Sequence, residues 1–186
     1  VVVLDENGDP MSLVVEEAAQ IIMIGDPMWC PDGDTPGTDA LDSIIECTPS
    51  FASFTDLINE LTTNTATYNG SGTIYVAYDY DATTAGDTGG DIIFDYGDLA
   101  LTNLAVQGGW DFTSDSVFGT STIDLGTGNS VEFWDWGGYA TPGSLTLRDI
   151  IITNSDGLYI GDDSDFTTAD VTLDNVDVID TTWGTY

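Results

Sequence analysis

A short apolar pattern that recurs along the chain restricts the folds open to it more than any other feature. Its clearest copy lies within Gly143–Gly157, GSLTLRDIIITNSDG, where two pairs of apolar residues with period two flank Asp149. Period two is the spacing of residues on one face of a β-strand, so each pair predicts a short strand with one buried face. The same arrangement occupies residues 99–106, 145–152 and 171–178.

The spacing of the copies predicts a solenoid. Successive copies start 46 and then 26 residues apart, and we attribute the longer spacing to one additional turn near Ser130–Trp136. Repeats of this length cannot bury an apolar face alone, so they stack and cover one another. The central polar position predicts a corner, because Asn and Asp tolerate left-handed backbone. It is held by Asn103, Asp149 and Asn175, which could stack into a ladder.

The segments before residue 72 have a different character. Val1–Val15 contains two apolar runs around Asn7-Gly8, which predicts a β-hairpin. Residues 16–25 predict a short helix that stops before Pro27. We therefore divide the chain into an N-terminal region, 1–52, and a solenoid with its capping helix, 53–186.

Residues 53–64 predict one amphipathic helix. Ser53 and Asp56 frame its start in the manner of a capping box. The apolar side chains fall on one helical face, at Phe54, Leu57, Ile58 and Leu61. Beyond Gly72 we find strand patterns and no further helix pattern.

The charge excludes two classes of partner. The chain has 33 acidic residues, one basic residue (Arg148), no His and a net charge of −32. Without a cationic surface it cannot bind nucleic acid by displacing counterions, and an anionic membrane surface repels it. No apolar run approaches the length of a membrane span, and the chain itself shows no signal-peptide pattern, so we read it as a mature chain already trimmed or as part of a longer one.

So many carboxylates predict a divalent cation, and Ca²⁺ is the hard cation that prefers several oxygen ligands. The densest groups lie in loops beside strands, at Asp79, Asp81, Asp87 and Asp91 and at Asp162, Asp163 and Asp165. Two alternatives stay open: the acids only solvate the surface, or they adapt the protein to high salt.

Cys30 and Cys47 bracket a short loop rich in Pro, Gly and Asp. A zinc site is implausible because there is no His and no further Cys. We therefore expect a disulfide, which implies an oxidising, extracellular compartment; two buried free thiols are the alternative. Asn69 begins an Asn-Gly-Ser glycosylation sequon.

From Phe54 to Tyr186 the chain resembles the right-handed parallel β-helix, the pectin-lyase-like fold. The resemblance rests on FTDLINEL leading into GTIYVA, on LTNLAVQGGWD and on the two later copies of the repeat. In that fold an amphipathic helix covers the first coil, which implies this role for residues 53–64. The phrase GDPMWCPDG followed by CTPSFASFTDLI is similar to the N-terminal part of secreted, adhesin-like bacterial surface proteins. This implies a structural or adhesive role at a cell surface or in a biofilm matrix.

We predict no catalytic residues. Asn154–Gly157 (NSDG) and Gly161–Asp163 (GDD) match two hydrolase motifs of the family in letters, but Asp156 and Asp162 are only six residues apart. The family's later motifs need His and Lys, which the chain lacks. Arg148 lies beside a predicted corner, so we expect it to point outward and pair with an acid.

Four aromatic residues open an alternative function, a carbohydrate-binding or carbohydrate-cleaving module. Exposed Trp and Tyr rings can stack on sugars, although in a β-helix large side chains more often fill the interior or pack loops. The candidates for contact with a glycan or a partner are Trp110, Trp134, Trp136 and Tyr139.

The unassigned N-terminal run predicts self-assembly. An open β-helix end exposes a strand edge over an apolar core. We expect the strand-forming run Val1, Val2, Val3, Leu4 of one copy to pair with the last coil of the next, which gives a head-to-tail filament. The alternatives are that Val1–Val15 folds back on its own helix, or that the native chain continues.

Overall fold

The structure is a computed structural model of the chain. It describes residues 27–36, 47–48, 50–77, 79–87, 90–111, 116–134, 136, 143–161, 170–182 and 184–185. The described part is mostly β-structure with few helices, consistent with the predicted all-β class. The hairpin predicted in Val1–Val15 and the helix predicted at 16–25 lie outside the described residues.

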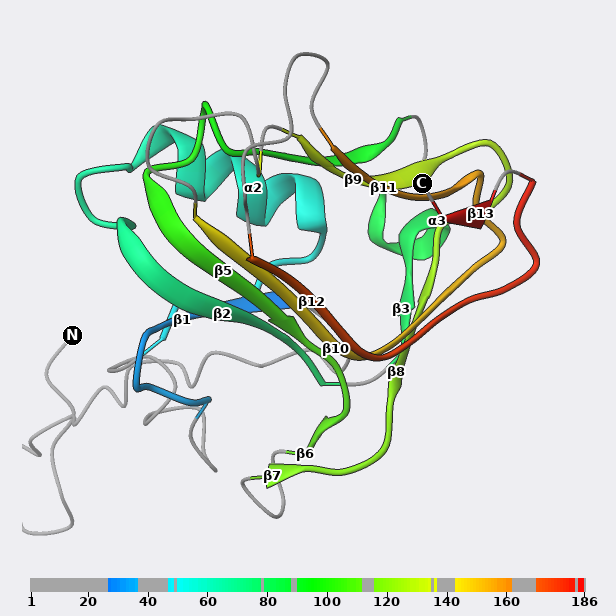
Figure 1. Ribbon diagram of the computed structural model, residues 1–186, viewed down its shortest axis with the longest axis horizontal. Coiled ribbons are helices and arrows are strands. Elements are labelled where there is room, and N and C mark those ends of the chain that lie inside the picture. Colours follow the sequence, from blue (N-terminus) through cyan, green and yellow to red (C-terminus); the bar gives the residue numbers. More distant parts are fainter. Residues whose placement is uncertain are drawn as a thin grey trace, which may run out of the picture.

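Two sheets contain most of the strands, and they face a common interior (Figure 1). The larger sheet has seven: β1 (Pro27–Pro31), β2 (Gly70–Val76), β3 (Tyr80–Asp81), β5 (Leu101–Gln107), β8 (Ser121–Asp124), β10 (Ser144–Thr153) and β12 (Asp170–Val178). The smaller has four: β4 (Ile92–Asp95), β9 (Ser130–Trp134), β11 (Gly157–Gly161) and β13 (Gly184–Thr185). In these two sheets β1 runs antiparallel to β2, and the other described pairs are parallel.

The alignment of the last two copies of the repeat is confirmed. In the β10–β12 pair Leu145 lies opposite Val171 and Ile152 opposite Val178, the predicted spacing of 26 residues. The predicted corner also forms, because Asp149 adopts left-handed backbone with φ of 54°. The part of β10 before Asp149 pairs with β5, and the part after Asp149 pairs with β8.

The alignment of the first copy was wrong by five residues. Leu145 lies opposite Leu104, 41 residues earlier, and not opposite Leu99. Most of the extra length is an excursion in which β6 (Trp110–Asp111) pairs antiparallel with β7 (Ser116–Val117). The additional turn predicted near Ser130–Trp136 is also wrong, because β9 lies there and pairs directly with β4 and β11.

The predicted amphipathic helix is confirmed as α2 (Phe54–Thr63). The Ser53 hydroxyl oxygen caps it by accepting from the Asp56 backbone N–H at 3.0 Å, as the spacing of these two residues predicts. Phe54, Leu57 and Leu61 are buried in the main core, and α2 contacts β1 and β4. The helix therefore covers the interior near β1, at the edge of the larger sheet remote from β12 (Figure 1).

One helical turn was not predicted. It is α3 (Ala82–Ala85), which is too short to show helical periodicity in the sequence. Asp81 caps it, and hydrogen bonds from Thr83 and Thr84 hold the pKa of the Asp81 carboxyl below its usual range.

Candidate functional site

The last strand of the larger sheet presents apolar side chains to solvent. Val171 and Leu173 of β12 are 41% and 46% exposed, and Ile179 just beyond the strand is also exposed. Their partners across β10, Leu145 and Leu147, are 0% and 2% exposed. The same apolar pattern is thus buried in β10 and exposed in β12. Among the described strands, β10 has a neighbour on both sides, whereas β12 has one on a single side.

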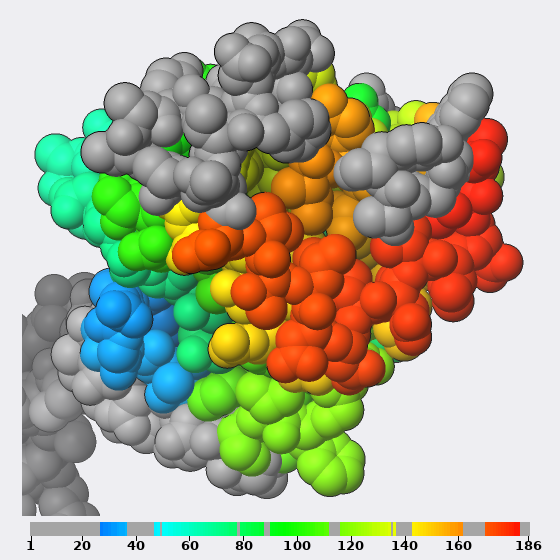
Figure 2. Space-filling view, in the orientation of Figure 1, coloured from blue at the N-terminus to red at the C-terminus, as the bar shows by residue number. Residues whose placement is uncertain are grey.

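The backbone edge of β12 is open as well. Within the described residues β12 pairs on one side only, with β10. The strand lies on the face turned toward the viewer in Figure 2, as the orange-red atoms. An unpaired strand edge beside exposed apolar side chains can accept an added strand, and we define Asp170–Val178 with its exposed side chains as the open end.

A polar ladder holds the corner of the open end in place. Asn175 of β12 adopts left-handed backbone with φ of 55°. It lies next to Asp149, the corresponding corner in the neighbouring strand β10. Its side-chain N–H donates to Asp149 Oδ1 at 2.8 Å, and Gln107 donates to Asp149 Oδ2 at the same distance. Asn103, predicted to be a corner, lies instead within β5 and bonds Ser71 and Ser144. The hydrogen bond from Asn175 to Asp149 therefore fixes the bend of β12.

The opposite edge of the sheet is closed. Beyond β1, the Thr48 N–H donates to the Trp29 carbonyl at 2.8 Å, and the Trp29 N–H donates to the Thr48 hydroxyl at 2.9 Å. Trp29 itself fills the interior above Gly72, where an added Cβ would overlap the indole. The two ends of the described molecule are therefore different, one covered and one open.

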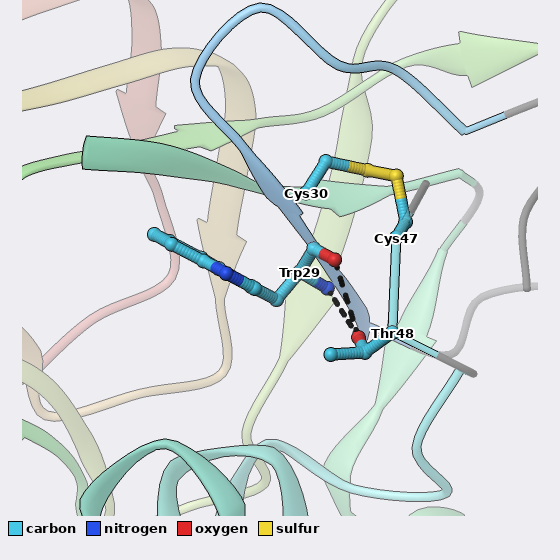
Figure 3. Close-up of a disulfide and its surroundings, with 4 residues drawn as sticks. All are labelled: Trp29, Cys30, Cys47 and Thr48. Carbon is cyan, nitrogen blue, oxygen red and sulfur yellow. Dashed lines mark hydrogen bonds between the residues drawn. A yellow bond between two sulfur atoms is a disulfide. The ribbon is translucent and has the colours of Figure 1, made fainter. Parts of the chain in front are cut away.

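The predicted disulfide is present, joining Cys30 to Cys47. Figure 3 shows the Trp29 ring directed away from it, with Thr48 bonded to the Trp29 backbone. Cys30 and Cys47 form a small buried cluster with Met28, next to Tyr75. The bridge thus ties the segment around Thr48 to β1 and keeps this end covered.

The first predicted calcium group is dispersed in the structure. Asp87 accepts from the Phe54 N–H at 3.0 Å and from the Tyr80 hydroxyl, and so caps α2 from outside the helix. The other three acids accept from backbone N–H groups of different elements: Asp79 from Thr122, Asp81 from Thr83 and Thr84, and Asp91 from Ser130. In the described part of the chain no three acidic or other metal-ligating side chains gather at one point. Asp162, Asp163 and Asp165 lie outside that part.

A polar hollow of about 300 Å³ lies beside two of these acids. Its lining includes Asp56, Asp87 and Asp91 at the start of α2. Because Asp87 and Asp91 already accept backbone N–H groups, they serve the fold at this place.

Two of the four candidate aromatic residues pack inside the protein. Trp136 is buried and donates through Nε1 to the Phe94 carbonyl at 3.2 Å. Trp110 is buried against the Tyr75 ring, with centroids 4.9 Å apart. Their burial favours the packing alternative over contact with a glycan. Tyr139 lies outside the described residues, whereas Trp134 is partly exposed.

Three further residues singled out in the sequence are Asn69, Arg148 and Asn154. Asn69 is exposed, and its side-chain N–H donates to the Ala66 carbonyl at 2.9 Å. Arg148 is exposed, as predicted, with Asp174 opposite it on β12. Asn154, in the segment similar to a hydrolase motif, is a left-handed corner bonded to Asp124. Asn154 therefore has a structural role.

Of two relevant features, the sequence predicted one and carried a signal for the other. The open edge at the last coil was expected, although the apolar pattern of β12 by itself equals that of buried β10. Tyr159 and Glu132, which flank Trp134, were missed, although alternation in SVEFW and GLYIG would place all three on one face.

No protein-family model matches the chain, and no curated protein or solved structure is similar to it at a meaningful level. Among the described residues there is no helix of the length and apolarity that a membrane span requires.

Proposed function

We propose that the parallel strands are successive coils of a right-handed parallel β-helix. Three features support this reading. Equivalent residues of β2, β5, β10 and β12 lie opposite one another in parallel register. Left-handed corners recur one repeat apart, at Asp149 and Asn175 and again at Asn154 and Asp180. Finally, strands of both sheets contribute to one apolar core.

On this fold we propose an extracellular structural or adhesive protein whose copies join head to tail. The observation that carries the proposal is the open end, whose strand edge and apolar side chains are both available for an added strand. Because the edge at β1 is closed, the open end of one copy cannot simply extend the sheet of the next. The added strand must come from another segment, and we assign it to Val1, Val2, Val3 and Leu4 of a neighbouring copy.

A contact between two different surfaces that does not close into a ring builds a filament, and we propose this open form. The disulfide and the strong negative charge suit an oxidising space outside the cell, such as a cell surface or biofilm matrix. We propose no enzymatic role, because the chain lacks the His and Lys of the family's later motifs and Asn154, in the segment similar to one catalytic motif, serves as a corner.

Sedimentation velocity over a range of protein concentrations tests the assembly. We expect the full chain to associate and the Leu173→Asp variant to remain monomeric, because a charge there would be desolvated by an added strand. Thr172→Asp is the matched control, with the same added charge on the other face of β12. A full chain that stays monomeric throughout, or two variants that associate equally, would contradict the proposal.

A further inference from the structure

Two aromatic rings lie side by side on the outer face of the smaller sheet. Trp134 of β9 and Tyr159 of β11 are both partly exposed, with ring centroids 5.5 Å apart and planes tilted by 40°. Gly161 lies opposite Trp134, and a Cβ added to it would be 3.2 Å from Tyr159 Oη. The Tyr159 ring therefore lies over Gly161 and beside the Trp134 indole. Because Gly161 has no side chain, it leaves room for the ring.

A chain of hydrogen bonds fixes the orientation of the indole. Trp134 Nε1 donates to Glu132 Oε2 at 2.5 Å. Ser130 Oγ lies 2.5 Å from Glu132 Oε1 and 2.7 Å from Asp91 Oδ1, and can donate to either. Rings that are already fixed lose little conformational entropy when a ligand stacks on them.

The surroundings of the two rings combine apolar surface with hydrogen-bond acceptors. Ile93 is exposed in β4, directly opposite Glu132. Asp95, also in β4, lies opposite Trp134 of β9. Each carboxylate oxygen has more than one acceptor position, so these side chains can receive donors in addition to their present partners. Arg148, the single basic residue of the chain, belongs to the other sheet.

We propose that Trp134 and Tyr159 form a binding platform for a neutral polysaccharide. The C–H faces of pyranose rings would stack on the two aromatic rings, while sugar hydroxyls donate to Glu132 and Asp95. A polyanionic polysaccharide is disfavoured by the surrounding carboxylates and the net charge of −32. The platform belongs to a different sheet from the open end, so it requires no assembly.

Native gels that contain a dissolved polysaccharide test this proposal, because the acidic protein migrates readily and binding retards it. The probes are glucomannan, hydroxyethylcellulose and arabinoxylan, with polygalacturonate as the acidic comparison. We expect at least one neutral polymer to retard the full chain and polygalacturonate not to do so. Retardation by none of the neutral polymers, or by polygalacturonate alone, overturns the proposal.

Variants show whether the platform is responsible. Trp134→Ala and Tyr159→Ala, checked for folding by their melting curves, should each weaken the neutral-polymer affinity at least about tenfold. Phe118→Ala removes an exposed aromatic ring elsewhere and should bind like the full chain. Wild-type affinity in both platform variants overturns the assignment. Leu173→Asp should bind normally, so a failure of assembly and a failure of this site are distinguishable.

Discussion

Gly72 takes the place that larger apolar residues hold in the later repeats. It lies opposite Leu104, which in turn lies opposite Leu145. The missing side chain leaves the space that the Trp29 indole fills from β1. The absence of a side chain at Gly72 thus allows the Trp29 ring of β1 to cover β2.

Gly72→Ala should lower the free energy of unfolding by about 1–3 kcal/mol, because the new methyl group would overlap the Trp29 ring and the Cys30 carbonyl oxygen. Urea unfolding followed by fluorescence measures the change. Gly90→Ala is the control, since an added Cβ there meets no atom within 4 Å and should alter stability little. Equal effects of the two substitutions would show that the indole does not depend on the glycine.

Asp149 combines two properties that substitutions can separate. It adopts left-handed backbone and accepts side-chain hydrogen bonds from Gln107 and Asn175. Asp149→Ala should destabilise the protein by about 2 kcal/mol, through the lost bonds and because Ala tolerates left-handed backbone less well than Asp. Asp149→Gly also removes the hydrogen bonds, but glycine adopts left-handed backbone freely. The melting temperature of Asp149→Gly should therefore be higher than that of Asp149→Ala. The reverse order would refute the corner argument.

At the scale of elements, local signals were reliable and long-range spacing was not. The helix α2 and the β10–β12 register follow from short periodic patterns and were predicted. The register of β5 was missed because the β6–β7 excursion lengthens one repeat without changing the apolar pattern on either side. The exposure of β12 was expected from its place as the last repeat, whereas its apolar pattern alone, which equals that of buried β10, does not show it. The hydrogen bonds around Trp134 join residues up to 39 positions apart in sequence, which no local pattern reveals.

The disulfide should stabilise the covered end. It closes a loop with a sequence separation of 17 residues, which corresponds to about 3 kcal/mol. Reduction should therefore lower the melting temperature, and intact mass with and without reductant should report one bridge. The Cys30→Ser/Cys47→Ser double variant should melt like the reduced protein and show no response to reductant. Two cysteines that alkylate freely in the native protein would exclude the bridge.

For the whole molecule, the net charge of −32 opposes folding by self-repulsion. At low ionic strength, Ca²⁺ should raise the melting temperature and a chelator should reverse the gain, because an ion bound to the folded state stabilises it by mass action. The triple variant Asp162→Asn/Asp163→Asn/Asp165→Asn should lose most of this gain if those acids supply the ligands. An equal gain from NaCl at matched ionic strength would instead identify screening, and no gain at all would leave the acids a solvating role.

Assembly is the property of the whole molecule on which this account depends, and amide hydrogen exchange at β12 tests it most directly. The exchange of residues 170–178 is measured in the full chain and in a chain lacking Val1–Val15, both at a concentration at which the full chain associates. We predict slow exchange at the outer edge of β12 in the full chain and fast exchange after the deletion, because only the full chain supplies the added strand. Identical exchange in the two proteins would contradict strand addition by the N-terminal segment.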